Sequence, residues 1–304
     1  MYFFKRILNL PLLLLLISVL AFMLIRLAPG GPFDRERKPA SPEIERALLA
    51  RYHLDEPLWK QYGRFLTGLV HGDFGASLKY RNHTVTDIIL QGLPVSLAVG
   101  GMAFCLAMGL GIPAGFYGAV KRGSWTDHWI AVLTLVAVCV PGFVIGPILV
   151  MVFAVKLRWF PPALWGGLAH AVLPSVSLGL FFAGKVARLL REGMSETLEC
   201  DFIRAARAKG LSETAILLRH GLRLGILPVV SYSGPMLADL LTGSFVVENL
   251  FQLPGIGVFL VNGSLSRDYP MVVGLVLVYA VLLLVLNLLV DLAYSVLDPR
   301  VKYV

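Results

Sequence analysis

The stretch Asp201–Pro228, DFIRAARAKGLSETAILLRHGLRLGILP, is polar and basic, although long apolar runs precede and follow it. Its pattern predicts two short helices joined by a turn. Asp201 is a candidate N-cap for the first helix, and Gly210 stands where that helix would end. Ser212 can cap the second helix, with Glu213 in its first turn. The stretch is therefore expected to form a helix, a glycine turn and a second helix.

Three interpretations of this stretch compete. It could be a solvated basic loop, a helix-turn-helix that reads DNA, or a docking element for a soluble partner. The DNA interpretation is the weakest, because so short a segment between two apolar runs lacks a third helix with which to build a core.

The composition indicates a membrane protein. The chain has 304 residues, of which 57% are hydrophobic and 15% charged, and its mean hydropathy is +0.76. Soluble domains have about 45–50% apolar and about 25% charged residues. In such a chain, the net charge of +8 is better explained by basic cytoplasmic loops than by nucleic-acid binding. The three cysteines lie far apart, so we expect no disulfide and no metal site.

The apolar runs predict an all-α polytopic membrane protein with six transmembrane helices. The segment 1–27 is expected to be an anchor helix, 28–93 a small helical extracytoplasmic insert, and 94–304 the transmembrane domain with a cytoplasmic loop at about 191–224. Helices are expected in the insert at 42–54 and 58–69. The predicted spans lie at about 7–27, 94–120, 129–155, 171–190, 225–247 and 271–292.

Two further patterns concern these spans. Gly111 and Gly115 are four residues apart in the second span and predict close helix packing. Pro141 lies within the third span and predicts a kink. Lys and Arg are concentrated in the segments that lie inside if both termini are cytoplasmic, whereas the short outer loops carry only Lys156, Arg158 and Arg267. The positive-inside rule therefore favours cytoplasmic termini.

A resemblance to a known family adds to this interpretation. Arg204-Ala205-Ala206, three further residues and Gly210 match the EAA-x3-G signature of ABC-importer permeases, with Arg204 in place of the glutamate. The signature's Leu-Pro follows at 227–228. The stretches RLAPGGPF (26–33), YHLDEP (52–57) and HGDFGASLKY (71–80) resemble the B-type membrane subunit of oligopeptide and dipeptide importers. This resemblance extends over essentially the whole chain.

The resemblance implies a type I ABC-importer permease fold and a set of partners in a bacterial inner membrane. These are a homologous second permease subunit, one or two cytoplasmic ABC ATPase subunits, and an extracytoplasmic binding protein that delivers oligopeptides. ATP and Mg would bind the ATPase subunits, and this chain would hold no cofactor. Dipeptides, nickel, glutathione and peptide-like compounds are alternative substrates. The residues implied to couple to the ATPase, within 201–223, are Arg204, Ala205, Ala206, Arg207, Lys209, Gly210, Leu211, Ser212 and Glu213.

Other candidate residues are fewer. Asp239 lies in an apolar span, where a carboxylate is expected either to line a translocation path or to be paired. Glu248 and Arg267 lie at the outer ends of spans and are candidate contacts for a binding protein.

No catalytic motif favours an enzyme. The sequence from Gly179 to Lys185 fits the start of a P-loop, but Val186 replaces the Ser or Thr that would hold magnesium. An ion-coupled secondary transporter would need buried ionisable pairs and an inverted repeat. The spans offer at most Asp239 for such a pair, and the sequence has no clear repeat. A channel would require a selectivity filter and no docking loop.

Overall fold

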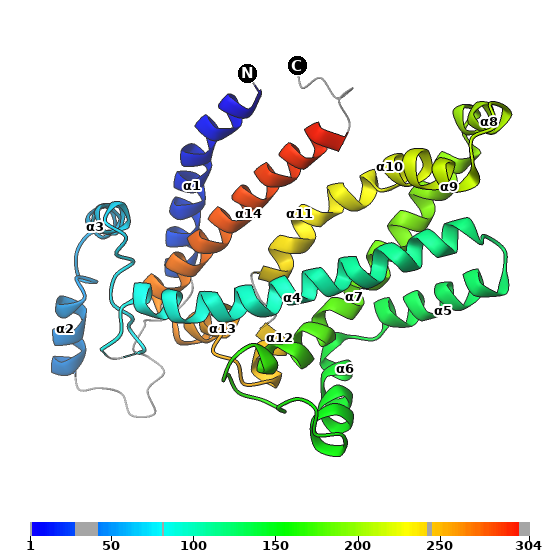
Figure 1. Cartoon of the computed structure of the whole chain (residues 1–304). Helices are drawn as coiled ribbons and strands as arrows, with labels where there is room; N and C mark the ends of the chain where they lie inside the picture. The colour runs from blue at the N-terminus through cyan, green and yellow to red at the C-terminus, as the bar shows by residue number, and fades with distance from the viewer. Residues whose placement is uncertain (1, 28–41, 81, 242–244, 298–304) are drawn as a thin grey trace. The chain divides into compact units, whose positions relative to one another are not determined.

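The computed structural model describes residues 2–27, 42–80, 82–241 and 245–297, and these residues form helices and one isolated β-bridge between Ala76 and Thr84 (Figure 1). The chain divides into two compact units. Unit 1 comprises residues 1–96 and 254–282, and unit 2 comprises residues 97–253 and 283–304. Helices α4 and α14 each contribute to both units. We describe each unit by itself.

Unit 1 contains the N-terminal helix and the predicted insert. Its helices are α1 (Tyr2–Leu27), α2 (Pro42–Arg51), α3 (Leu58–Val70), the first part of α4 (Val85–Val120), α13 (Ile256–Ser266) and the first part of α14 (Tyr269–Leu297). The two helices predicted in the insert are thus present as α2 and α3. In contrast, α4 begins at Val85, so the expected boundary at residue 93 falls inside a helix. The sequence analysis did not predict α13.

A buried carboxylate ties the insert to the start of α14. The side chain of Asp268 is fully buried and accepts hydrogen bonds from the Ser77 hydroxyl and from the backbone N–H of Lys79, at 3.2 Å. Its other oxygen accepts from the backbone N–H of Met271 at 3.3 Å. Because a buried charge requires such partners, this cluster fixes the turn after α3 against the α13–α14 corner.

Unit 2 is organised around one long helix, α7 (Leu168–Glu199). This helix contacts α5, α6, α8, α10, α11 and α12. The remaining elements, in chain order, are α5 (Trp125–Cys139), α6 (Gly142–Leu149), the π-helical turn η1 (Val150–Lys156), α8 (Asp201–Ala208), α9 (Glu213–Ala215), the π-helical turn η2 (Ile216–Gly221), α10 (Leu222–Gly225), α11 (Leu227–Leu241) and α12 (Phe245–Leu250).

The glycines of α4 bring it close to α7, as predicted. A Cβ atom on Gly111 would lie 2.7 Å from the Val186 side chain. A Cβ atom on Gly115 would lie 2.5 Å from the Ala187 carbonyl oxygen. Larger residues at these positions would push the two helices apart, so the small residues set the packing distance in this part of unit 2.

Among the described residues, four helices are long and apolar enough to cross a membrane, and the number of candidate spans is six if each of two bent helix pairs is one span. The fold is therefore an all-α polytopic membrane protein, as predicted. The predicted third span is strongly bent: α5 and the 142–156 helix meet at 100° where Pro141 interrupts them. The fifth is bent where α10 ends at Gly225 and α11 begins at Leu227.

Candidate functional site

The predicted first helix of the polar stretch is α8, and its N-cap differs from the prediction by one residue. Cys200 has the extended backbone of an N-cap, with φ −69° and ψ 150°, and makes no capping hydrogen bond through its side chain. Asp201 instead lies in the first turn, where its carboxylate is 3.2 Å from the Arg204 guanidinium. An acidic residue there is favoured because it faces the positive end of the helix dipole.

The turn after α8 is a Schellman motif that depends on Gly210. The N–H of Leu211 donates to the Ala206 carbonyl at 3.3 Å, and the N–H of Gly210 donates to the Arg207 carbonyl at 2.9 Å. Gly210 has φ +77°, a left-handed conformation that side chains other than glycine adopt at a cost. A Cβ atom at this position would meet nothing within 4 Å, so backbone conformation alone accounts for the glycine.

The second arm begins as predicted at Ser212, whose hydroxyl accepts a hydrogen bond from the Ala215 N–H at 3.4 Å. From Glu213 the helical backbone continues through α9, η2 and α10 to Gly225. The Arg207 guanidinium reaches across the turn to the Glu213 carboxylate at 2.9 Å. Both side chains are exposed, so this ion pair adds little stability but links the two arms.

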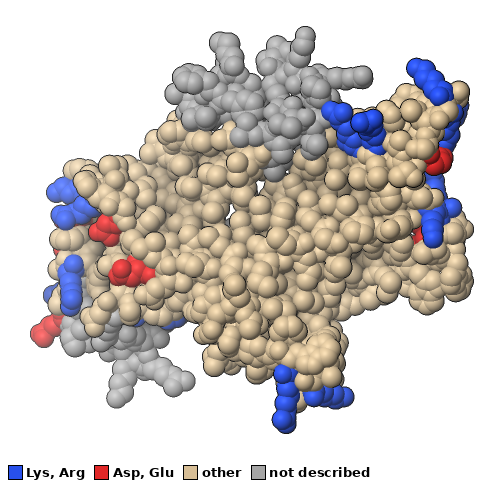
Figure 2. Space-filling view, in the orientation of Figure 1, with Lys and Arg blue, Asp and Glu red and all other residues tan. Residues whose placement is uncertain are grey.

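The helix α8 has an inner face and an outer face. Ile203 and Ala206 are buried against Ile216 of η2 and form a small hydrophobic cluster. Phe202 on the outer face of α8 and Leu211 in the turn after it expose 43% and 44% of their surface. Lys and Arg gather over the α8–α10 region in the space-filling view (Figure 2). The outer face is thus basic with exposed apolar residues, a composition suited to a protein partner.

Two glycines fix the base of this helical hairpin. A Cβ atom on Gly193 of α7 would lie 2.5 Å from the Gly225 carbonyl oxygen of α10. A Cβ atom on Gly225 would lie 2.6 Å from the Met194 side chain. Helices α7 and α10 therefore cross in backbone contact, and α8 follows at the end of α7, where Figure 1 places it.

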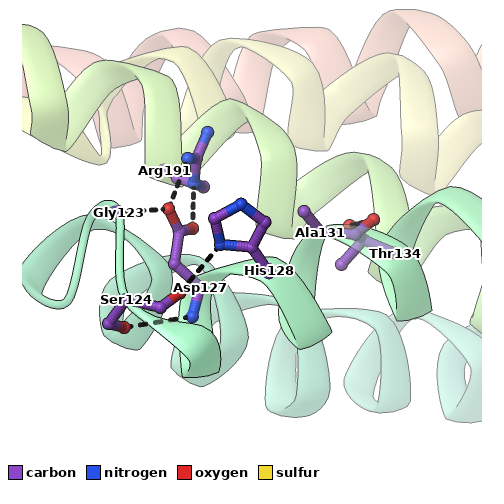
Figure 3. A network of polar contacts seen from close by, with 7 residues as sticks. All are labelled: Gly123, Ser124, Asp127, His128, Ala131, Thr134 and Arg191. Carbon is purple, nitrogen blue, oxygen red and sulfur yellow. Dashed lines mark hydrogen bonds and ion pairs between the residues drawn. The ribbon is translucent and has the colours of Figure 1, made fainter.

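A buried ion pair supports α7 close to this crossing. The Arg191 guanidinium donates two hydrogen bonds to the Asp127 carboxylate, at 2.7 and 2.8 Å (Figure 3). The N–H of Gly123 donates to the same carboxylate at 2.9 Å, and the Asp127 side chain is only 5% exposed. At the C-terminal end of α7, the Arg122 guanidinium pairs with the Glu199 carboxylate at 2.6 Å.

These contacts attach the turn between α4 and α5 to the helix that leads into α8. The sequence analysis missed them, because nothing in the sequence indicates that residues 64 positions apart are paired.

The other predicted site residues belong to other elements than α8. Asp239 is exposed on α11, and Arg267 is partly exposed with a left-handed backbone. Glu248 is buried, with 1% of its surface exposed. The carboxylate of Glu248 therefore does not reach the surface in this structure, and its contact with a binding protein stays a prediction that no observation here supports.

The glycines of the P-loop-like sequence lie inside α7 and serve helix packing. A Cβ atom on Gly179 would lie 2.9 Å from the Ala103 carbonyl oxygen of α4. A Cβ atom on Gly184 would lie 2.8 Å from the Thr134 carbonyl oxygen of α5. Their backbone belongs to a continuous helix and is not a loop that could cradle phosphates.

Comparison with known proteins shows the family of this chain. Residues 111–303 match the model of the family described as binding-protein-dependent transport system inner membrane component. The chain belongs to this family. It is 43% identical over 305 residues to the oligopeptide transport system permease protein OppB of Haemophilus influenzae, covering 99% of both chains. It is also 38% identical to the dipeptide transport system permease protein DppB of Bacillus subtilis, covering 99% of this chain and 97% of that one.

Solved structures show the same fold in other members of the ABC importers. The MetNI methionine ABC transporter in an inward-facing conformation gives a TM-score of 0.58 at 15% identity, covering 69% of this chain and 96% of that chain. An amino acid ABC transporter with histidines gives a TM-score of 0.52 at 16% identity, covering 68% and 93%. The chain is thus a multi-pass permease of the ABC-importer type.

Proposed function

We propose that this permease takes up oligopeptides that an extracytoplasmic binding protein delivers, and that it forms the pore with a second, homologous permease subunit. The 43% identity to an oligopeptide permease over nearly the whole chain is the main support for the substrate. One or two cytoplasmic ATPase subunits would bind ATP and Mg and supply the energy. This chain would hold no cofactor, and both of its termini would lie in the cytoplasm.

In this proposal the helical hairpin of residues 201–223 is the coupling loop. The observation that carries it is the rigid attachment of α8. Its inner face packs on Ile216, its turn is fixed by Gly210, and its base is locked where Gly193 and Gly225 cross. A force applied to the outer face of α8 by an ATPase would therefore move α7 and α10 with it. Closure of the ATPase pair would convert the permease between its inward- and outward-facing states.

Reconstitution tests the proposal. The chain is purified with the subunits that accompany it and placed in liposomes, with ATP on the side of the ATPases and loaded binding protein on the other. We expect a labelled oligopeptide to accumulate only when ATP is present. Solute movement by this chain alone without ATP would contradict the proposal and favour an ion-coupled transporter.

Dipeptide uptake is the second candidate, since a dipeptide permease is 38% identical over nearly the full length. The same liposomes decide between them. An excess of unlabelled dipeptide should leave oligopeptide uptake unchanged if the longer substrate is the preferred one.

A further inference from the structure

The side chain of Lys185 occupies an unusual place in α7. Its ammonium nitrogen lies over the Phe181 ring, 4.4 Å from the centroid, and over the Tyr232 ring at 5.8 Å. Within the described part of the chain, no carboxylate lies within ion-pair distance of this ammonium, and no acceptor receives a hydrogen bond from it. A lysine ammonium has three hydrogens to donate, and here the two rings are its partners.

This position lies inside a candidate membrane span, because α7 is one of the four helices long and apolar enough to cross. A charged side chain within a membrane span is costly, so it faces water, a partner or a ligand. Ring faces attract an ammonium but accept no conventional hydrogen bond. The site therefore holds a cation in position and leaves its donors available to a ligand.

Two more polar groups extend this site along α11. Tyr232 and Asp239 are seven residues apart on that helix, which is about two turns, so they share a face and are separated by about 10 Å along the axis. Tyr232 is partly exposed and Asp239 is exposed in this chain. The ammonium, the phenol and the carboxylate thus form a polar line across two helices of the apolar unit. Exposure of these three polar groups to lipid would be costly, whereas a water-filled path would hydrate them.

We infer that Lys185 binds the carboxylate of the transported peptide, and that Tyr232 and Asp239 line the same path. This inference rests on the proposed function. A zwitterionic peptide carries the complementary charges: its carboxylate would pair with the ammonium, and its amino group would face Asp239. An extended tripeptide is about 10 Å long, comparable with the spacing along α11. The class of ligand is therefore a short peptide with a free carboxyl end.

Transport of a peptide and of its C-terminal amide tests the pairing. The assay uses the reconstituted complex with saturating amounts of loaded binding protein. Any difference between the acid and the amide in affinity for the binding protein then does not affect the transport rate. We expect Lys185→Gln to lower transport of the free acid about tenfold and to leave the amide nearly unchanged. Lys185→Arg should retain most of the preference. Lys121→Gln removes a charge from an exposed turn and should behave like the parent protein.

Accessibility gives a readout that does not depend on transport. In a background with Cys105, Cys139 and Cys200 replaced by Ser, the Lys185→Cys variant is treated with a charged, water-soluble thiol reagent. We expect labelling, and we expect the peptide acid to protect the thiol better than the amide. A thiol that resists the aqueous reagent would place this side chain in lipid and overturn the inference.

The two hypotheses fail in different ways. If the parent complex moves no peptide with ATP, the proposed function fails. If it moves peptide and Lys185→Gln keeps the parent ratio of acid to amide transport, only the assignment of Lys185 fails.

Discussion

Substitution of Gly210 tests whether the shape of the turn transmits force to the spans. Its φ of +77° costs an L-residue about 1–2 kcal/mol, and a β-branched residue at least as much. No steric clash adds to this, because a Cβ atom would meet nothing within 4 Å. A cost of this size changes the population of the turn by a factor of about 5–30. In the Gly210→Val variant, the equilibrium between the native turn and other conformations would shift by this factor against the native hairpin.

A graded series sharpens the test. Asn tolerates the left-handed conformation better than Ala, and Ala better than Val, so coupling should fall in the order Gly, Asn, Ala, Val. Coupling is measured as peptides transported per ATP hydrolysed in liposomes. We expect ATP hydrolysis to persist in Gly210→Val while transport falls several-fold.

The chain contains a matched control for this series. Gly72 has φ +74°, has open space around its Cβ position, and follows α3 in a Schellman motif of the same pattern. Gly72→Val therefore carries a similar backbone cost in unit 1, outside residues 201–223. Equal loss of coupling in both Val variants would refute the argument, as would an unchanged ratio in Gly210→Val.

Four more predictions follow from particular contacts. Asp127→Asn and Arg191→Gln should each lower the free energy of unfolding by about 2–3 kcal/mol, because each leaves the charge of its partner unpaired. The double variant should recover part of this loss, which a melting experiment measures. Gly193→Ala should reduce assembly, since its Cβ would lie 2.5 Å from a backbone oxygen, whereas Gly109→Ala should be silent by the same membrane-expression assay. Asp268→Asn should make the insert more sensitive to protease while Asp55→Asn, an exposed change, should not, and equal sensitivity would count against the anchoring role. Asp239→Asn should lower peptide uptake if the carboxylate lines the path, and normal uptake across pH would mean that it is structural.

Local sequence patterns were enough to predict much of the helical hairpin at 201–223. The glycine turn and the Ser212 cap follow from preferences that act over four or five residues, and the structure has both. The N-cap differed from the prediction by one position. An aspartate is favoured both as an N-cap and in the first turn of a helix, and Asp201 lies in the first turn. Composition and hydropathy also identified the membrane class and the number of candidate spans.

The features that hold the loop in place depend on tertiary contacts. The Asp127–Arg191 pair joins residues far apart in the chain, and the Gly193–Gly225 crossing joins α7 to α10. Neither follows from a periodic pattern. Glu248 was placed at the outer end of a span from the hydropathy pattern, which does not indicate that the fold buries its side chain. The helix α13 is only 11 residues long, too short to be recognised as a span and too apolar to be recognised as a loop.

Cross-linking from α8 in the native membrane tests the central claim most directly. A photoreactive amino acid replaces Ala205, which is exposed on the outer face of α8, and a second variant carries it at Leu164 in the loop before α7. We predict that the Ala205 variant forms a product with a P-loop ATPase, identified by mass spectrometry, and that the Leu164 variant does not. An ATPase captured from Leu164, or none captured from Ala205 while the permease is correctly inserted, would contradict the account.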